Sequence, residues 1–240
     1  VINEEFYRKH YSDEYYTDTN KGLMARCASA LVLRNIREKE AHILDVVSGG
    51  NNKLSLLDVG CGEGSFLEQI DGSLFDKNGI ELNSQGVELC RKKNLNVMQG
   101  DVLTVKWSPK KYDVITMWHV LEHVAEPVKF LSRIKEVMAP GAVMFISVPN
   151  TGSIGFNHGK NWWFYVDAPR HIFLPDEHSM GELFRRTGLR LIRQFNDRLE
   201  FPLDIVWSLR KSSIKWLVYP LYPVFKLLSR ETLVYAVSMA

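Results

Sequence analysis

The sequence predicts a single α/β domain: a mostly parallel, twisted sheet of seven strands with helices on both faces and the last strand antiparallel. Short apolar segments alternate with amphipathic ones along the chain, which is the pattern of strand–helix–strand units. A cluster of glycines follows the first apolar segment, as it does in many nucleotide-binding α/β folds. The length of 240 residues suits one domain of this kind, and no internal repeat or low-complexity tract interrupts it.

Each expected element rests on a local pattern. Residues 22–47 carry apolar side chains at helical spacing and predict a helix. Three later helices are expected: one begins at Ser65, one follows Ser84 as its N-cap, and one has Pro127 in its first turn. A further helix is expected at 176–187, closed by Gly188. Residues 149–175 are not assigned to regular structure. Strands are expected at 54–59, 77–82, 94–98, 112–117, 142–148, 189–195 and 232–237.

The composition narrows the functional class. A net charge of +2 is too small to indicate a nucleic-acid partner. The three cysteines, Cys27, Cys61 and Cys90, lack metal-ligand spacing, so neither a metal site nor a disulfide is expected. No apolar run reaches the roughly 20 residues of a spanning helix, and the N-terminus has no signal-peptide pattern. We therefore expect a cytoplasmic protein.

One domain is expected to contain four segments. They are an N-terminal aromatic segment with a helix (1–53), a cofactor-binding core (54–200), a basic and aromatic insertion (201–230) and a closing strand (231–240).

The glycine cluster is the strongest local signal. Leu56-Leu-Asp-Val-Gly-Cys-Gly-Glu-Gly64 places a buried strand, a turn on glycines and a helix start in succession, where a ligand can approach the main chain. A dinucleotide fingerprint has glycines at the first, third and sixth positions, whereas here they occupy the first, third and fifth. The carboxylate of Asp58 suits the ammonium group of an amino-acid moiety and would repel a pyrophosphate.

Two more carboxylates follow the next two strands. Glu81 lies about twenty residues further on, at a position that can accept hydrogen bonds from ribose hydroxyls. Asp101 follows the third strand, where it can accept from an adenine amino group. Because parallel strands end at one edge of the sheet, we expect these side chains to line one crevice.

Together, the segments LLDVGCGEG, GIELN, QGD and YDVITMWHVLEHVAEP resemble the class I, Rossmann-like methyltransferases. They are most similar to the small-molecule group that includes the ubiquinone-biosynthesis O-methyltransferases, and PRHIFLP fits the same group. The resemblance covers roughly residues 54–195 and the closing strand. It implies S-adenosylmethionine as cofactor and S-adenosylhomocysteine as product. The residues that it implies for cofactor binding are Asp58, Gly60, Cys61, Gly62, Gly64, Glu81, Leu82, Asp101, Val102, Met117, Trp118 and His119.

A hydroxyl acceptor must lose a proton, and histidine is the usual base near neutral pH. His119, His123 and His171 are the candidates, with packing at a helix start as the alternative for the first two. His171 with Arg170 is the preferred acceptor-site pair, although Arg170 could equally form a structural ion pair.

Aromatic residues precede that pair. Trp162, Trp163 and Tyr165 either wall an acceptor pocket or pack a lid onto the sheet.

The insertion at 201–230 is rich in aromatic and basic residues, and Asp204 is its only acidic residue. Packing on the body or a dimer contact is the favoured explanation. The alternative is contact with a membrane surface or a lipid-linked acceptor. Either a monomer or a homodimer fits the sequence.

The predicted function is transfer of a methyl group from S-adenosylmethionine to a small-molecule acceptor, with a hydroxyl oxygen preferred. Two other functions stay open: an NAD(P)-dependent oxidoreductase, and a non-catalytic protein that binds S-adenosylmethionine.

Overall fold

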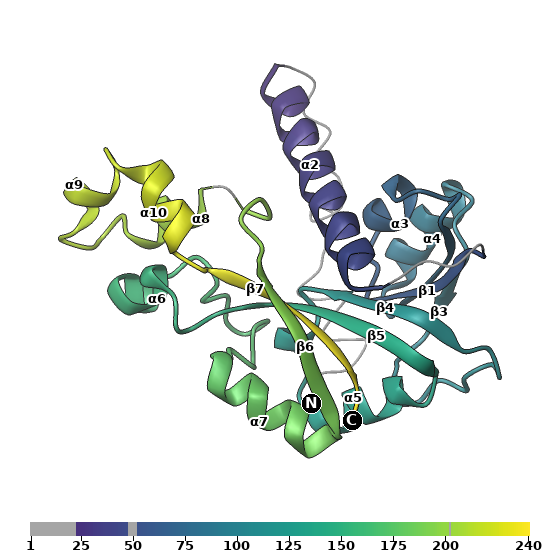
Figure 1. Cartoon of the computed structure of the whole chain (residues 1–240). Helices are drawn as coiled ribbons and strands as arrows, with labels where there is room; N and C mark the ends of the chain where they lie inside the picture. The colour runs from purple at the N-terminus through teal and green to yellow at the C-terminus, as the bar shows by residue number, and fades with distance from the viewer. Residues whose placement is uncertain (1–22, 48–51, 202) are drawn as a thin grey trace.

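The computed structural model describes residues 23–47, 52–201 and 203–240 (Figure 1). The aromatic N-terminal segment predicted within 1–53 lies largely outside these residues. Seven strands form one sheet in the order β3-β2-β1-β4-β5-β7-β6. The strands are β1 (Leu54–Val59), β2 (Phe75–Glu81), β3 (Val97–Gln99), β4 (Tyr112–Trp118), β5 (Met138–Pro149), β6 (Leu189–Asn196) and β7 (Thr232–Met239).

Pairing along the sheet is parallel from β3 through β5, and β7 is antiparallel to both of its neighbours, β5 and β6. The predicted seven-stranded, mostly parallel sheet with an antiparallel last strand is therefore confirmed.

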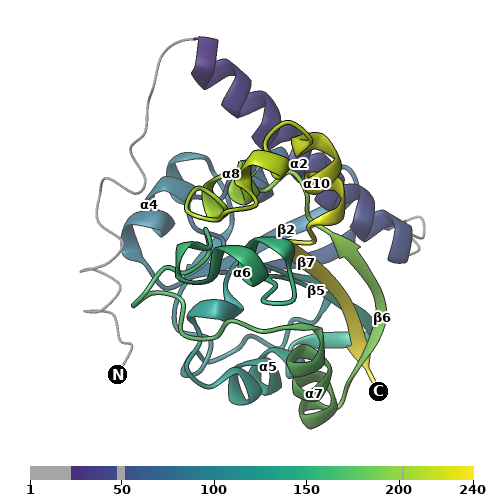
Figure 2. The ribbon, with the colours of Figure 1, turned by 90° about the vertical axis from the view of Figure 1, so that its left-hand side faces the viewer.

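Helices cover both faces of the sheet, as expected (Figures 1 and 2). Val114 and Ile115, neighbours on β4, point into two different apolar cores because successive strand side chains alternate between faces. One core takes side chains from α2, α3 and α4, and the other from α5 and α7. The helices are α2 (Leu23–Val46), α3 (Ser65–Gln69), α4 (Ser84–Lys92), η2 (Leu121–His123), α5 (Pro127–Lys135), α6 (Ile154–Gly159), η3 (Lys160–Trp162), α7 (Glu177–Thr187), α8 (Asp204–Ser208), α9 (Lys215–Val218) and α10 (Tyr222–Leu228).

Several boundaries differ from the prediction. The N-cap of α4 is Asn83, whose side chain accepts from the amides of Gln85 and Gly86, so Ser84 is already inside the helix. Strand β5 begins at Met138, four residues before the expected start, because Met138 already pairs with Tyr112. The segment 149–175, for which the sequence predicts no regular structure, contains α6 and η3.

In the described ranges, no helix has the length and apolar character needed to cross a bilayer.

Candidate active site

The strand order reverses between β1 and β4, and open α/β sheets bind their ligands at such a point, beyond the carboxyl ends of the strands. The two strands are in register there, with Asp58 opposite Thr116. The Thr116 hydroxyl donates to the Asp58 carboxylate over 2.7 Å, and only 2% of Asp58 is exposed. Burial raises the pKa of Asp58 to about 7, although the Thr116 hydrogen bond and the Lys39 ammonium oppose the rise.

The glycine loop after β1 uses its three glycines in different ways. Gly60, Gly62 and Gly64 all have left-handed backbone, with φ of 68°, 56° and 80°. A Cβ at Gly60 would lie 2.6 Å from Val120, and one at Gly64 would lie 2.4 Å from Leu95, so both positions are close-packed. A Cβ at Gly62 would meet nothing within 4 Å. The loop therefore leaves open space at Gly62, where a ligand can approach the main chain.

Glu81, at the end of β2, holds this loop in place. Its carboxylate accepts from the Gly62 amide and from the Asn83 amide, both over 2.8 Å. Burial raises the pKa of Glu81, and these amide hydrogen bonds oppose the rise. Glu81, the residue predicted to bind the ribose hydroxyls, thus lies directly beside the glycine loop.

The other predicted cofactor residues lie near the same edge of the sheet. Asp101, beyond β3, accepts from the Leu103 amide over 2.9 Å and is half-buried. Leu82 is half-buried, whereas Cys61, Val102 and Met117 are buried in the apolar cores. Cys61 and Cys90 are free thiols.

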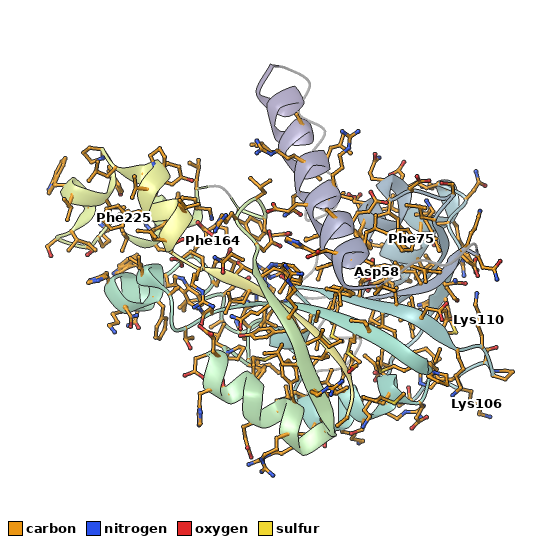
Figure 3. All side chains as sticks on the ribbon, in the orientation of Figure 1. Asp58, Phe75, Lys106, Lys110, Phe164 and Phe225 are labelled. Atoms are coloured by element: carbon orange, nitrogen blue, oxygen red, sulfur yellow. The ribbon has the colours of Figure 1, made fainter. Side chains whose placement is uncertain are left out.

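A lysine from α2, Lys39, acts electrostatically on Asp58, which Figure 3 shows beside this helix. The Lys39 ammonium forms ion pairs with Glu200 and, over 3.7 Å, with Asp197, and lies 4.7 Å from the ring centroid of Trp118. Burial alone would lower the pKa of Lys39, but the two carboxylates outweigh it and raise the pKa. The Trp118 indole N–H is buried and has no hydrogen-bond partner within the described residues.

His119 follows β4 directly and is held by a buried carboxylate. Its Nδ1 lies 2.8 Å from an oxygen of Glu122, whose side chain is fully buried. The backbone of His119 is left-handed, with φ of 55°, and such strain in a residue other than glycine is concentrated at functional sites. Burial alone would lower the pKa of His119, but the Glu122 charge outweighs it and raises the pKa above 6.5.

The other two candidate histidines pack against each other. The rings of His123 and His171 lie 4.8 Å apart, and their Nδ1 atoms contact the carbonyl oxygens of Arg170 and Tyr165 over 3.0 and 2.7 Å. The carbonyl of Glu122 also accepts from the amides of Ile172 and Phe173. The loop that carries His171 is therefore fixed to η2, and Arg170 forms an ion pair with Asp167.

Two groups of side chains have ligand atoms within 4.8 Å of one another and could hold a cation. The first is Glu122, His123 and His171, and the second is His119, Asp197 and Glu200. In the second group the Lys39 ammonium already forms ion pairs with both carboxylates. The expectation that the chain has no resident metal stays a prediction.

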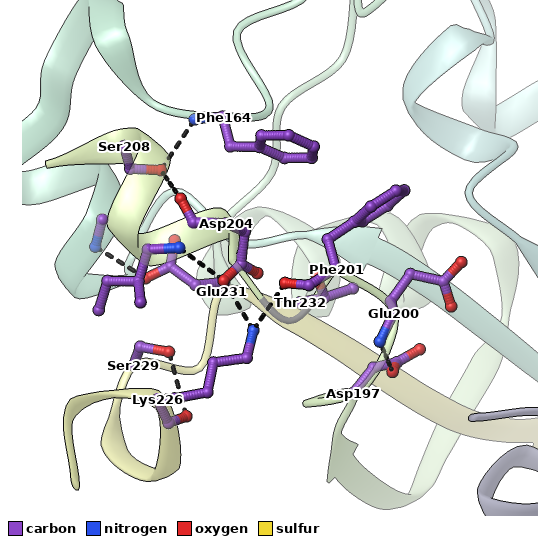
Figure 4. Close-up of polar contacts among 12 residues, drawn as sticks. Phe164, Asp197, Glu200, Phe201, Asp204, Ser208, Lys226, Ser229, Glu231 and Thr232 are labelled. Carbon is purple, nitrogen blue, oxygen red and sulfur yellow. Dashed lines mark hydrogen bonds and ion pairs between the residues drawn. The ribbon is translucent and has the colours of Figure 1, made fainter. Parts of the chain in front are cut away.

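Aromatic rings flank His119. The rings of Tyr165 and Phe201 lie 6.1 and 5.9 Å from it, and Phe164 lies 5.0 Å from Phe201 (Figure 4). The Tyr165 hydroxyl donates to Asp204 over 3.0 Å and accepts from Thr232 over 2.9 Å, which fixes the ring.

The two tryptophans before Tyr165 lie in different surroundings. Trp163 is buried and donates to Glu231 over 2.7 Å, which fits the alternative of packing onto the sheet. Trp162 is 49% exposed on η3.

Four residues of this site were not predicted from the sequence: Lys39, Glu122, Asp197 and Glu200. Glu122 carried a local signal, since it follows His119 by three residues, within one turn of a helix. Lys39 and Glu200 are 161 residues apart, and no local pattern connects them.

A strand-end crevice, a glycine loop and an acidic residue on the second strand define a nucleotide-binding class of α/β protein. The family model described as "Methyltransferase domain" matches residues 27–194, and the chain belongs to this family. The predicted class of S-adenosylmethionine-dependent methyltransferase is thereby confirmed, and the oxidoreductase alternative is set aside.

Several curated relatives share one name. The chain is 28% identical over 190 residues to a ubiquinone biosynthesis O-methyltransferase of Paraburkholderia phytofirmans, with 74% of each chain covered. It is 31% identical over 154 residues to the enzyme of that name from Nitrosospira multiformis, with 56% of this chain and 62% of the relative covered. Other relatives of this name are matched over about half of their length.

Solved structures show the same fold. Magnesium protoporphyrin IX methyltransferase from Synechocystis, with bound SAH, superposes with a TM-score of 0.63 at 14% identity, covering 99% of this chain and 98% of that one. The plantazolicin methyltransferase BpumL, also with SAH, has a TM-score of 0.58 at 17% identity, covering 99% and 100%.

Replacing Glu81 tests the ribose assignment. We expect Glu81→Gln to weaken the binding of S-adenosylhomocysteine at least about tenfold, because hydrogen bonds to a charged acceptor each contribute roughly 1.5–3 kcal/mol. Isothermal titration calorimetry measures the change, with Glu88→Gln, an exposed carboxylate on α4, as the matched control. Equal affinity in Glu81→Gln and the wild type would remove Glu81 from the site.

Proposed function

We propose that the chain methylates a hydroxyl oxygen of a small molecule, with His119 as general base and Glu122 as the residue that orients it. The contact between His119 Nδ1 and the buried Glu122 carboxylate carries this proposal. A carboxylate at Nδ1 fixes the tautomer in which Nε2 is free to accept a proton. The contact from Nε2 to the Ser147 hydroxyl is 3.5 Å, too long to compete strongly for that atom.

The crevice fits S-adenosylmethionine on three observations. Gly62 opens onto free space, the buried carboxylate of Asp58 and the half-buried carboxylate of Glu81 lie near it, and the Trp118 N–H is unsatisfied within the described residues. We propose that Asp58 holds the ammonium of the methionine moiety and Glu81 the ribose hydroxyls, with Asp101 at the adenine end. When bound, the cofactor supplies a methyl group on a sulfonium.

Side chains of this protein remove the proton from the acceptor and position it. His119 would take the hydroxyl proton at Nε2 as the acceptor oxygen bonds to the methyl carbon and the bond from that carbon to the sulfonium sulfur breaks, with S-adenosylhomocysteine as the leaving group. Glu122 would stabilise the resulting imidazolium. Tyr165, Phe164 and Phe201 exclude water and position the acceptor. Because these three groups are aromatic, we propose a phenolic acceptor, and the shared O-methyltransferase name of the relatives supports oxygen as the methylated atom.

His171 and Arg170, the pair preferred from the sequence, have a different place in this proposal. His171 Nδ1 is engaged by the Tyr165 carbonyl, and Arg170 is engaged by Asp167. We propose that both position the loop over the acceptor, together with His123. The free thiols Cys61 and Cys90 support a cytoplasmic location, where thiols stay reduced.

Cofactor affinity should depend on pH through Asp58. With its pKa at about 7, the Asp58 carboxyl is largely protonated at pH 6 and must ionise to hold an ammonium group. We therefore expect binding of S-adenosylhomocysteine to strengthen about tenfold between pH 6 and pH 8 and then to level off. Calorimetry over this range should show the rise in the wild type and a flat, weaker profile in Asp58→Asn. A rise that persists in Asp58→Asn would assign the titration to another group.

Activity should depend on His119 and on the charge of Glu122. We expect His119→Ala to lower kcat by about 10²- to 10⁴-fold, the usual contribution of a general base.

Glu122→Gln removes the charge that raises the His119 pKa, so the acid limb of the kcat–pH profile should move to lower pH. Initial rates with labelled S-adenosylmethionine and a panel of phenols give both values.

His178→Ala, an exposed histidine on α7, is the matched control for the loss of an imidazole. If His171→Ala abolishes turnover while His119→Ala retains it, the base is His171. An unmoved acid limb in Glu122→Gln would contradict the orienting role of Glu122.

A further inference from the structure

Residues 203–230 form a small helical lobe of α8, α9 and α10, attached beside α6 (Figures 1 and 2). Its own core is small, built around Ile205, Leu209 and Val218. Polar contacts attach it to the body. The Phe164 amide donates to the Ser208 hydroxyl over 2.9 Å (Figure 4). Asp204 also accepts from the Tyr165 hydroxyl. The lobe is therefore fixed beside the proposed acceptor site. We call the rings of Phe164, Tyr165 and Phe201 at that site the aromatic wall.

The lobe exposes an unusual amount of apolar side chain. Trp216 on α9 is 76% exposed and Trp207 on α8 is 56% exposed, although tryptophan is normally well buried. Six aliphatic residues of the lobe are between 47% and 67% exposed: Leu203, Leu217, Leu221, Val224, Leu227 and Leu228. Apolar exposure concentrated in one short segment indicates an interaction surface.

Cations are interleaved with these rings. The Arg210 guanidinium lies 4.5 Å from the ring centroid of Trp207 and 5.0 Å from that of Trp162, so it joins α8 to η3. The Lys211 ammonium lies 5.6 Å from the Trp162 ring, and the Lys215 ammonium lies 5.1 Å from the Trp216 ring. We call Trp162, Trp207, Arg210, Lys211, Lys215 and Trp216 the aromatic–basic surface.

No acidic side chain offsets these cations on the lobe. Asp204, the only acidic residue in 203–230, is 1% exposed and forms an ion pair with Lys226 over 2.7 Å. Arg210, Lys211 and Lys215 therefore present an uncompensated positive charge. Two copies of the chain would repel each other through this surface, whereas an anionic surface would attract it.

We propose that the aromatic–basic surface docks the protein onto an anionic lipid bilayer. Tryptophan rings favour the headgroup region, lysine and arginine are attracted to anionic lipids, and exposed leucines can enter the acyl boundary. No helix of the lobe exceeds seven residues, so the contact is peripheral. Docking would hold the aromatic wall near the bilayer surface, where an amphipathic acceptor can reach it. The docking itself does not depend on the proposed methyl transfer.

Vesicle co-sedimentation of the full chain tests this proposal. We expect binding to mixed phosphatidylcholine–phosphatidylglycerol vesicles, weakening as salt is added, and little binding to phosphatidylcholine alone. Trp207→Ser with Trp216→Ser should weaken binding at least about tenfold, and so should Lys211→Glu with Lys215→Glu. The charge variants change exposed or half-exposed side chains, so they report on binding even if the tryptophan variants fold poorly.

The matched controls lie away from the lobe. Leu74→Ser removes an apolar side chain that is 40% exposed, and Arg91→Glu with Lys92→Glu reverses two exposed charges on α4. Both controls should bind vesicles as the wild type does.

Three results would overturn the proposal. They are no sedimentation of the wild type with anionic vesicles, equal binding to neutral vesicles, and unchanged binding in both lobe variants. Light scattering that shows a dimer disrupted by Trp216→Ser would instead assign the surface to contact between copies.

Discussion

The hydrogen bond from Thr116 to Asp58 joins β1 and β4 at the point where the strand order reverses. Backbone pairing sets the register of these two strands, with Asp58 opposite Thr116, and the hydrogen bond reinforces it. The register determines the relative position of the segments that leave the carboxyl ends of the strands. The glycine loop with Gly62 follows β1, and His119 follows β4. Proposed cofactor and proton-transfer groups are thus placed side by side by backbone pairing, which is more rigid than contact between loops.

Glu122 connects that crevice to the acceptor side. Its side chain holds His119, and its carbonyl accepts two amides of the loop that carries His171. A buried carboxylate is costly unless it is well paired, and the charge of His119 lowers the Glu122 pKa despite the burial. The same residue therefore sets the electrostatics of the proposed base and the position of the covering loop.

Most of the fold could be predicted because its signals are local. Apolar segments, Pro127 and Gly188 located strands and helix ends closely, although Met138 joined β5 through pairing with Tyr112 that no local pattern shows. The predicted carboxylates do lie along one edge of the sheet. The Lys39–Glu200 ion pair could not be predicted, since it depends on how α2 docks against a segment far along the chain.

Titration of the wild-type chain with S-adenosylhomocysteine and, separately, with NAD tests the central claim most directly. The account predicts one binding site for S-adenosylhomocysteine and none for NAD, because Asp58 favours an ammonium and repels a pyrophosphate. Saturable heat with S-adenosylhomocysteine alone would support the crevice between β1 and β4 as the site. Binding of NAD, or no binding of S-adenosylhomocysteine, would contradict it.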